Sequence, residues 1–537
     1  MPSPNAKIVR SRISKVCVAI IGNTASELIE KANAVVKETP FLEFRLDYLE
    51  KPAAALPKIK EFLEVNNVST VIATCRRIPN GGKFDGTLAA QLEILVKAAN
   101  AGCQIVDIEL ESAEALKKAE YQKLRDTGAA IICSFHDFKA TPDLDAVYAR
   151  IAPFEPDFFK VVTTAKSLVD NVTMIRFIER MSDVSDVIGL CMGDTGIISR
   201  VLSLRAGAPF TFAAATIGEE TGPGQIAART LVETYRIEEV DAATKIYGVA
   251  GNPVGKSLSP IMLNTAFRRE TVNAVYLALQ TNKVEDLVEL IREIPIHGVS
   301  ITMPHKQTIL PYLAHMDPLS QKIGACNTIL RAQDGNLYGF NTDVQGIIAP
   351  LEKRISLKGA KVLVLGAGGS GRAAVFALRD KGAEVHILNR TPETAAKLAK
   401  QSGAKVFKRE AFHHKTNPAT FDVIINSTPI GMAGNKGAQI LTADELKTKI
   451  VFDLVYNPAD TPLIRMARAQ GIHVITGVEM FVQQGARQFE IWTGKPAPEE
   501  EMLRVVVHAL RQQAEIAAAA PAESETPVKK SKSAKAS

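Results

Sequence analysis

The stretch DFFKVVTTAK, residues 157–166, places a lysine inside an aromatic and β-branched run of the kind that forms buried strands. Removing an unpaired ammonium from water costs several kcal/mol, so Lys160 needs a reason to be there. A neutral lysine amine attacks a carbonyl carbon and forms a Schiff base. Lys160 is therefore the first candidate nucleophile of the chain.

Other polar side chains end or follow similar apolar runs in the first 235 residues. They are Glu43, Arg45 and Asp47 in EFRLD, Arg76, Ser134 and His136 in SFHDF, Arg200 in GIISR, and Thr221 and Gln225 in ETGPGQ. Arginines suit a substrate carboxylate, which at least one of them would hold bidentately. Desolvation and nearby arginines would also lower the pKa of a lysine amine and make it nucleophilic.

Each of these residues has a structural explanation when it is taken alone. Glu43 and Arg45 could form a satisfied ion pair, and His136 could be a hydrogen-bonded structural histidine. A lysine in a strand usually lies on an edge strand, where its charge prevents pairing with another sheet, but a closed barrel has no edge strands. The explanation for Lys160 therefore depends on the fold.

The elements that must position these residues form a regular series. Eight β-branched runs begin near residues 16, 41, 70, 105, 130, 158, 187 and 210, and helix-like segments lie between most of them. Alternating strands and helices predict parallel pairing, and eight strands close a (β/α)8 barrel. The carboxyl ends of the strands line the active site of such a barrel, which would gather the polar residues named above.

The motifs EFRLDYL, SFHDF, FKVVTTA and GPGQ, in this order, resemble type I 3-dehydroquinate dehydratases over residues 15–235. The resemblance implies that Lys160 forms an imine with the C3 ketone of 3-dehydroquinate. His136 would be the acid/base that removes a C2 proton and helps to expel the C1 hydroxyl. The implied substrate-binding residues are Glu43, Arg45, Arg76, Arg200, Thr221 and Gln225.

Two positions depart from that family. Thr221 stands where a serine is common, which keeps the hydroxyl. The family usually has a glutamate, paired with the catalytic histidine, just before Gly81 and Gly82, whereas this chain has Asn80. An asparagine can hydrogen-bond His136 but cannot stabilise an imidazolium by charge. We expect the pKa of His136 to differ accordingly from that in the family.

A second group of polar residues begins near residue 245. GKSLSP places Ser257 and Ser259 two apart at a strand-to-helix turn, although Ser259 before a proline could equally be a helix N-cap. Further candidates are Ser300, Thr302 and Lys306 in SITMPHK, Asn327 in GACNT, and Asn341 and Asp343 in GFNTD. Hydroxyls, amides and a lysine–aspartate pair predict a pocket for a polyol acid.

A glycine loop follows this region. GAGGSG, after the strand-like KVLVL and before a helix, has the spacing that lets a backbone approach a pyrophosphate at a helix N-terminus. The next strand ends in Asn389, Arg390 and Thr391 instead of the acidic residue that binds the NAD ribose. A guanidinium suits a 2′-phosphate, so Arg390 favours NADP. The segment predicts a Rossmann domain.

These motifs, with NSTPIGM, DLVYNP and EMFVQQGARQFEIW, resemble shikimate dehydrogenases over about residues 245–515. The resemblance implies that Lys306 and Asp343 are the catalytic pair: Lys306 gives a proton to the carbonyl oxygen as NADPH delivers hydride, and Asp343 orients both. The implied substrate contacts are Ser257, Ser259, Ser300, Thr302, Asn327, Tyr456 and Gln484. The candidate cofactor-binding residues are Gly366, Gly368, Gly369, Gly371, Asn389, Arg390, Thr391, Ser427 and Thr428.

The two resemblances predict a plant-type bifunctional enzyme that converts 3-dehydroquinate to 3-dehydroshikimate and then to shikimate. We predict an N-terminal extension (1–14), a barrel (15–236), a substrate-binding domain in two segments (245–345 and 477–515), a Rossmann domain (346–476) and a disordered basic tail (518–537). One alternative is a second half that prefers quinate and NAD. Another is a ligand-sensing regulator, which would lack catalytic residues that this chain retains.

Composition restricts the remaining possibilities. The 537 residues, 46% hydrophobic and 23% charged, are typical of a globular protein of roughly three domains. The six cysteines form no CxxC pair and predict a reducing compartment without structural metal. The net charge of +6 lies largely in a tail without interleaved aromatic residues, so we expect no nucleic-acid partner. With neither a signal peptide nor a membrane span predicted, the cytoplasm is the expected location.

Overall fold

The computed structural model describes residues 9–416, 418–432 and 439–519. The chain forms two compact units. The first runs up to residue 348 and includes 372–377 and 483–499; the second comprises 349–371, 378–482 and the chain from residue 500 on. Each unit is described by itself below.

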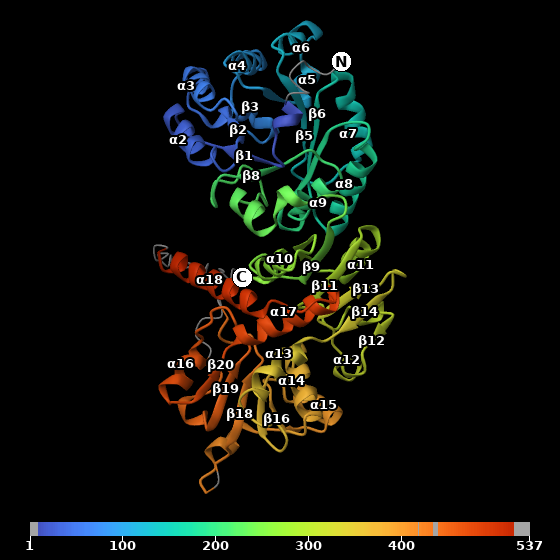
Figure 1. The fold of residues 1–537 in the computed structure, drawn as a ribbon, viewed down its shortest axis with the longest axis vertical. Helices are drawn as coiled ribbons and strands as arrows, with labels where there is room; N and C mark the ends of the chain where they lie inside the picture. The colour runs from blue at the N-terminus through green and yellow to red at the C-terminus, as the bar shows by residue number, and fades with distance from the viewer. Residues whose placement is uncertain (1–8, 417, 433–438, 520–537) are drawn as a thin grey trace, which may run out of the picture. The chain divides into compact units, whose positions relative to one another are not determined.

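The first part of unit 1 is a parallel eight-stranded barrel (Figure 1). Its strands are β1 (Val16–Ile20), β2 (Phe41–Arg45), β3 (Thr70–Thr74), β4 (Ile105–Glu109), β5 (Ala130–His136), β6 (Phe158–Thr164), β7 (Val187–Met192) and β8 (Thr211–Ala214). They pair in the order β7-β6-β5-β4-β3-β2-β1-β8. Among the described residues no ladder joins β7 to β8, so the barrel is nearly closed. The predicted fold class is confirmed.

Helices cover the outside of this barrel. They are α2 (Ala25–Val35), α3 (Pro52–Val65), α4 (Leu88–Asn100), α5 (Leu110–Ala115), α6 (Lys118–Arg125), α7 (Leu144–Ile151), α8 (Leu168–Met181) and α9 (Ser199–Arg205). Each connects consecutive parallel strands, as the crossover geometry of a βαβ unit requires.

Alternation along the strands separates the side chains inside the barrel from those packed under the helices. Phe41 on β2 and Phe158 on β6 belong to the cluster inside the barrel, whereas Leu42 and Val161 belong to the cluster beneath the helices. Since side chains alternate between the two faces of a strand, Lys160 points inward with Phe158. Its strand pairs with β5 on one side and β7 on the other, which rules out the edge-strand explanation.

The second part of unit 1 is a six-stranded mixed sheet. Its strands are β9 (Lys245–Gly251), β10 (Ala274–Gln280), β11 (Ile296–Ile301), β12 (His315–Met316), β13 (Thr328–Arg331) and β14 (Leu337–Phe340), in the order β10-β9-β11-β13-β14-β12. Its helices are α10 (Ser259–Arg269), α11 (Val284–Glu293), α12 (Pro318–Ile323) and α13 (Asp343–Glu352). Trp492 on α17 (Gly477–Thr493) donates to Ile329 O on β13 at 2.9 Å and lies against Gly298, where a Cβ would come within 2.3 Å of the indole nitrogen.

Unit 2 contains a parallel six-stranded sheet. Its strands are β15 (Lys361–Leu365), β16 (Glu384–Leu388), β17 (Lys405–Val406), β18 (Phe421–Asn426), β19 (Thr448–Asp453) and β20 (His473–Ile475). The order β17-β16-β15-β18-β19-β20 is the 3-2-1-4-5-6 order of a Rossmann fold, with its topological switch point at β15. The helices are α14 (Gly369–Asp380), α15 (Pro392–Ser402), α16 (Pro462–Ala469) and α18 (Glu499–Ala519).

The predicted tail falls mostly outside the described residues. Helix α18 continues through Ala519, two residues into the segment predicted to be disordered, and residues 520–537 are not described.

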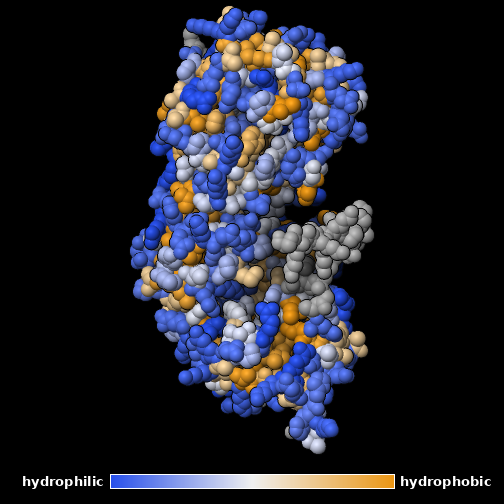
Figure 2. Space-filling model, turned by 180° about the vertical axis from the view of Figure 1, so that it is seen from behind, coloured by the Kyte–Doolittle hydropathy of each residue, from blue (hydrophilic) through white to orange (hydrophobic). Residues whose placement is uncertain are grey.

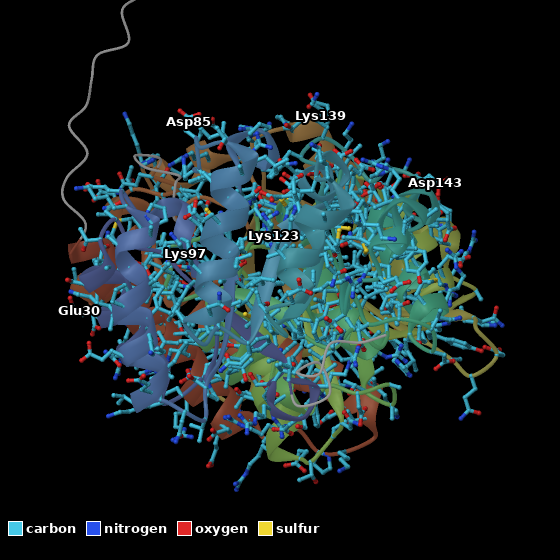
Figure 3. All side chains as sticks on the ribbon, turned by 90° about the horizontal axis from the view of Figure 1, so that it is seen from above. Glu30, Asp85, Lys97, Lys123, Lys139 and Asp143 are labelled. Carbon is cyan, nitrogen blue, oxygen red and sulfur yellow. The ribbon has the colours of Figure 1, made fainter. Side chains whose placement is uncertain are left out.

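The surface carries the charged side chains of the helices. Figure 2 shows hydrophilic side chains over most of one face, with hydrophobic residues in scattered areas between them. In Figure 3, Glu30 on α2 and Asp143 before α7 lie at the outer edge of the view, and both are exposed. None of the helices within the described ranges is both long enough and apolar enough to span a bilayer.

Candidate active sites

One pocket at the carboxyl ends of the barrel strands gathers all the residues predicted for the first reaction. Its lining includes Glu43, Arg45, Arg76, His136, Lys160, Arg200, Thr221 and Gln225. Apolar side chains complete it, among them Phe138, Met192 and Phe212. Strand ends far apart in sequence thus meet at one site, and the individual roles of the residues stay predictions.

The buried charges pair differently from the simplest expectation. Arg45 donates to both oxygens of Asp47, at 2.9 and 2.8 Å, so the proposed Glu43–Arg45 pair is not formed. Glu43 instead accepts from Thr74 Oγ1 at 2.7 Å and lies 3.8 Å from Lys160 Nζ. The acidic neighbours of Lys160 were thus missed when only arginines were considered.

Asp107 on β4 is the main partner of Lys160. Its Oδ2 accepts from Lys160 Nζ at 2.9 Å, and both its oxygens accept from Arg76 Nη2 at 3.0 Å. The neighbouring charges of Arg76 and Lys160 prevail over burial and hold the pKa of Asp107 far below its usual range. Sequence reasoning overlooked this residue, although a carboxylate at an inward position of IVDIEL is as unusual in a buried strand as Lys160.

Arg200 is held by main-chain oxygens. Its guanidinium donates to the carbonyls of Gly224 at 2.8 Å, Phe212 at 3.3 Å and Pro223 at 3.4 Å, and burial lowers its pKa to about 10. The contacts described so far set four cations, Arg45, Arg76, Lys160 and Arg200, against three carboxylates, Glu43, Asp47 and Asp107. The surplus positive charge suits a ligand with one carboxylate.

His136 is held by an arginine instead of an acid. Arg76 Nη1 lies 2.9 Å from His136 Nδ1. Burial, together with the charges of Arg76 and Lys160, holds the pKa of His136 well below its ordinary value, so the imidazole is neutral at pH 7. Asn80 donates to Glu111 Oε2 at 2.8 Å. Its amide therefore binds Glu111 and not His136, the partner that the sequence left possible.

The predicted catalytic pair of the second reaction is in contact. Lys306 Nζ lies 2.5 Å from Asp343 Oδ2. Asn327 Nδ2 donates to the other carboxylate oxygen at 2.7 Å, which fixes the orientation of Asp343. Asp343 is the first residue of α13, and its carboxylate is buried while the lysine side chain is 18% exposed. The lysine thus remains within reach of a ligand.

A hydrogen-bonded network extends from this pair. Ser300 Oγ accepts from Tyr276 at 2.6 Å and donates to Gln488 Oε1 at 2.8 Å. Gln488 Nε2 donates to the carbonyl oxygen of Asn327 at 3.3 Å. Tyr276 and Gln488 were missed by sequence reasoning; the spacing of Gln488 one helical turn after Gln484 was the available signal.

The remaining predicted substrate contacts are placed as follows. Ser259 is the first residue of α10 and Leu258 precedes it as the cap, so the N-cap alternative for Ser259 is wrong. Ser257 Oγ accepts from the Ser259 backbone N–H at 3.2 Å, and Thr302 is half-buried just after β11. Tyr456 belongs to unit 2, where its ring stacks on Phe481 with centroids 4.3 Å apart.

The glycine loop of unit 2 has the form that a dinucleotide requires. Gly366 has φ of +104°, which only glycine adopts readily, and a Cβ at Gly371 would lie 2.6 Å from Gly366 O. Nothing lies within 4 Å of a Cβ at Gly368, and α14 begins at Gly369. The loop therefore leaves room for a pyrophosphate in front of a helix N-terminus.

The other candidate cofactor residues surround this loop or end β16. Ser427 Oγ donates to Leu365 O at 2.7 Å, and Thr428 Oγ1 donates to Asn426 Oδ1 at 2.7 Å. Asn389 Nδ2 donates to Thr391 O at 3.0 Å, and Arg390 between them is exposed. An exposed guanidinium after the second strand fits a 2′-phosphate.

Family models match four segments of the chain. The type I 3-dehydroquinase model matches residues 16–242 and the shikimate dehydrogenase substrate binding domain residues 249–329. The shikimate/quinate 5-dehydrogenase model matches residues 350–459, and the shikimate 5′-dehydrogenase C-terminal domain residues 477–507.

Individual proteins match the whole chain or its second half. The chloroplastic bifunctional 3-dehydroquinate dehydratase/shikimate dehydrogenase of Arabidopsis thaliana is 34% identical over 508 residues, covering 91% of this chain and 83% of its own. The NADP(+) shikimate dehydrogenase of Methanosarcina acetivorans is 38% identical, covering 50% of this chain and 99% of its own. A solved shikimate 5-dehydrogenase of Thermus thermophilus, in complex with NADP(H) and shikimate, is 36% identical with a TM-score of 0.46, covering 50% of this chain and 100% of its own.

Proposed function

Because the chain belongs to the family of bifunctional 3-dehydroquinate dehydratase/shikimate dehydrogenases, we propose which of its side chains carry each reaction. The barrel dehydrates 3-dehydroquinate to 3-dehydroshikimate. The second half reduces 3-dehydroshikimate to shikimate with NADPH.

In the barrel, Lys160 is the nucleophile and His136 the acid/base. The amine of Lys160 attacks the C3 ketone, water leaves, and the resulting iminium accepts the electron pair of the C2–H bond. His136 takes the C2 proton and returns a proton to the departing C1 hydroxyl. Water then adds to the imine carbon, which releases the product ketone and restores the free amine of Lys160. Its lowered pKa supports this role, because the imidazole stays neutral and can accept a proton at pH 7.

Arg200 and Gln225 hold the substrate carboxylate in this proposal. The surplus positive charge at Arg200, whose contacts are main-chain carbonyls, supports that assignment. Glu43, Arg45, Arg76 and Thr221 line the same pocket and would contact the hydroxyls of the substrate.

The single observation that carries the dehydratase assignment is a lysine on an interior strand that lines one pocket with the predicted acid/base of the neighbouring strand. Borohydride reduction in the presence of 3-dehydroquinate tests it. We expect a stable adduct on Lys160, identified by peptide mass spectrometry. An adduct on another lysine, or none, would refute the assignment.

In the second half, Lys306 donates a proton to the ketone oxygen and Asp343 holds the lysine in position. Their 2.5 Å contact and the bond from Asn327 to the carboxylate support this division of roles. Ser257, Ser259, Ser300, Thr302 and Gln484 would bind the substrate hydroxyls and carboxylate, and Tyr456 is proposed as a further contact. Replacing Lys306 should lower the rate of reduction strongly while substrate still binds.

NADP is the proposed cofactor, and it supplies the hydride when bound. The open space at Gly368 and the left-handed backbone at Gly366 support a pyrophosphate site formed with Gly369 and Gly371. Arg390 would bind the 2′-phosphate, with Asn389, Thr391, Ser427 and Thr428 nearby. The naming of the Methanosarcina relative as an NADP(+) enzyme supports the same choice.

Quinate is a second candidate substrate for this half, because the matching family model covers both shikimate and quinate dehydrogenases. Rates of shikimate oxidation with NADP and of quinate oxidation with NAD decide between them. We expect shikimate with NADP to be strongly preferred.

For the compartment we propose the cytoplasm, since all six cysteines are free and buried, as a reducing environment allows. The Arabidopsis relative is chloroplastic, so cell fractionation with an antibody against this chain is the test.

A further inference from the structure

We propose that Asp107 is a positioning residue of the dehydratase site, which holds Lys160 directly and, through Arg76, fixes the tautomer of His136. The inference rests on the proposed dehydratase function of the barrel. Asp107 links the nucleophile to the acid/base, and it acts on the reaction only through these two residues.

Both oxygens of the Asp107 carboxylate are engaged. Oδ2 accepts from Lys160 Nζ at 2.9 Å, and Oδ1 accepts from Ser134 Oγ at 2.6 Å. Arg76 Nη2 donates to both oxygens at 3.0 Å. The Asp107 side chain is 1% exposed, so these charge-assisted bonds act in a medium of low dielectric constant, where they are strong.

Arg76 carries the effect of Asp107 to the histidine. While Nη2 is bound to Asp107, Nη1 directs its two hydrogens to Ser134 Oγ at 3.2 Å and to His136 Nδ1 at 2.9 Å. A guanidinium has donors only and keeps its protons, so Nδ1 must be the acceptor in this bond. The proton of the neutral imidazole is then on Nε2.

In this tautomer the basic lone pair of His136, on Nδ1, accepts the hydrogen bond from Arg76. His136 can take a proton at Nδ1 only when Arg76 Nη1 turns to another acceptor. A substrate oxygen in the pocket that Arg76 lines competes for the same hydrogen. Substrate binding therefore frees the base, and the pairing with Asp107 keeps Arg76 in place while it does so.

A purely structural ion pair does not account for this arrangement. Such a pair needs one partner, whereas Asp107 contacts the ammonium, the guanidinium and a hydroxyl at once. Asn80 is bonded to Glu111, so the charged groups that contact His136 and its neighbours here are Arg76 and Asp107.

The test compares the pH dependence of kcat/KM for 3-dehydroquinate in the wild type, Asp107→Asn and Arg76→Gln. The negative charge of Asp107 raises the pKa of His136 and the positive charge of Arg76 lowers it. We expect D107N to move the acid limb to lower pH and R76Q to move it to higher pH. The kcat of D107N should fall about 100-fold, a typical contribution of acid–base catalysis.

The controls separate charge from packing. Ser134→Ala removes a neutral donor from Asp107 and a neutral acceptor from Arg76 Nη1 but changes no charge, so it should leave the acid limb in place. Asp107→Glu keeps the charge and should recover part of the lost kcat. Reductase activity of each preparation reports whether the rest of the chain is intact.

Nitrogen-15 spectra of histidine-labelled wild-type protein, with His136→Gln to assign the signals, test the tautomer without relying on any variant of Asp107. We expect a protonated Nε2 and a bare Nδ1 at pH 7. A protonated Nδ1, an unmoved acid limb in D107N, or a shift of both variants in one direction would overturn the inference. A wild type without a borohydride adduct on Lys160 would instead refute the dehydratase assignment itself.

Discussion

The two candidate sites of this chain stabilise their buried polar groups in different ways. The barrel pocket concentrates charges: Arg45 with Asp47, and Lys160 and Arg76 with Asp107. The reductase site has one such pair, Lys306 and Asp343, and surrounds it with hydroxyl and amide groups.

The difference follows from the chemistry that each site is proposed to perform. Imine formation creates and removes charge on the protein itself, so the barrel keeps counter-charges within hydrogen-bonding distance. Reduction needs one proton donor and an oriented polyol, which neutral hydrogen bonds hold with less desolvation. The two sites should therefore respond differently to the loss of a charge.

The largest effect should come from Lys160→Met. Without the amine no imine can form, and dehydratase kcat should fall by about 10⁴-fold or more. Reductase kcat should be unchanged, because its site contains none of the barrel residues. The formation of the conjugated product, followed by absorbance, measures the first rate, and NADPH consumption measures the second. Residual dehydratase activity near the wild-type value would mean that the barrel does not use Lys160.

Lys306→Met is the converse change in the second site. Loss of a positioned proton donor should lower reductase kcat by about 10²–10⁴-fold. The KM for 3-dehydroshikimate should change less, since the hydroxyl and amide groups remain. Dehydratase activity of the same preparation is the control. An equal loss of both activities would argue against independent sites.

Asp47→Asn and Asp343→Asn compare stability across the two sites. D47N leaves the fully buried Arg45 guanidinium without its carboxylate and should destabilise the barrel by about 3–5 kcal/mol. D343N leaves Lys306, which is partly exposed, and should cost only about 1 kcal/mol.

Urea unfolding separates the two responses. The only tryptophan, Trp492, lies on α17, so its fluorescence follows the reductase half while circular dichroism follows the whole chain. If D47N and D343N lowered the free energy of unfolding equally, the two sites would not differ in how much their buried charges contribute to stability.

The smallest effect should come from an exposed charge in unit 2. Arg390→Ser removes the guanidinium proposed for the 2′-phosphate and should raise the KM for NADP by about 10- to 100-fold, as loss of one charge-assisted contact does. The KM for NAD should change little. Thermal unfolding should match the wild type, because Arg390 is exposed. A parallel rise in both KM values would point to a damaged glycine loop instead.

Much of the fold and the composition of both sites could be predicted from local patterns. The period of the eight runs identified the barrel, and inward alternation placed Lys160 among the residues of one pocket. The strand–glycine–helix context of GAGGSG identified the Rossmann sheet. The two-residue strand β17 was missed, because two residues carry no periodic signal.

The partners of these residues were harder to predict. Asp107 stands in a predicted strand and went unnoticed. The ion pair of Arg45 with Glu43 was considered as a structural alternative, whereas Arg45 binds Asp47. Gln488 lies in the quoted motif EMFVQQGARQFEIW but was given no role, and Tyr276 belongs to no motif, yet both join the reductase network. In each case the sequence shows the residue type, but it does not show which side chain that residue contacts.

The sequence by itself determined the two folds, the family and the predicted residues that line the barrel pocket, because side-chain periodicity and loop motifs are local properties. Only the tertiary structure decided which acid neutralises which base and which nitrogen of His136 accepts a hydrogen. Those choices depend on distances of a few ångströms between side chains from different strands. Strand register and rotamers set such distances, and no local spacing along the chain records them.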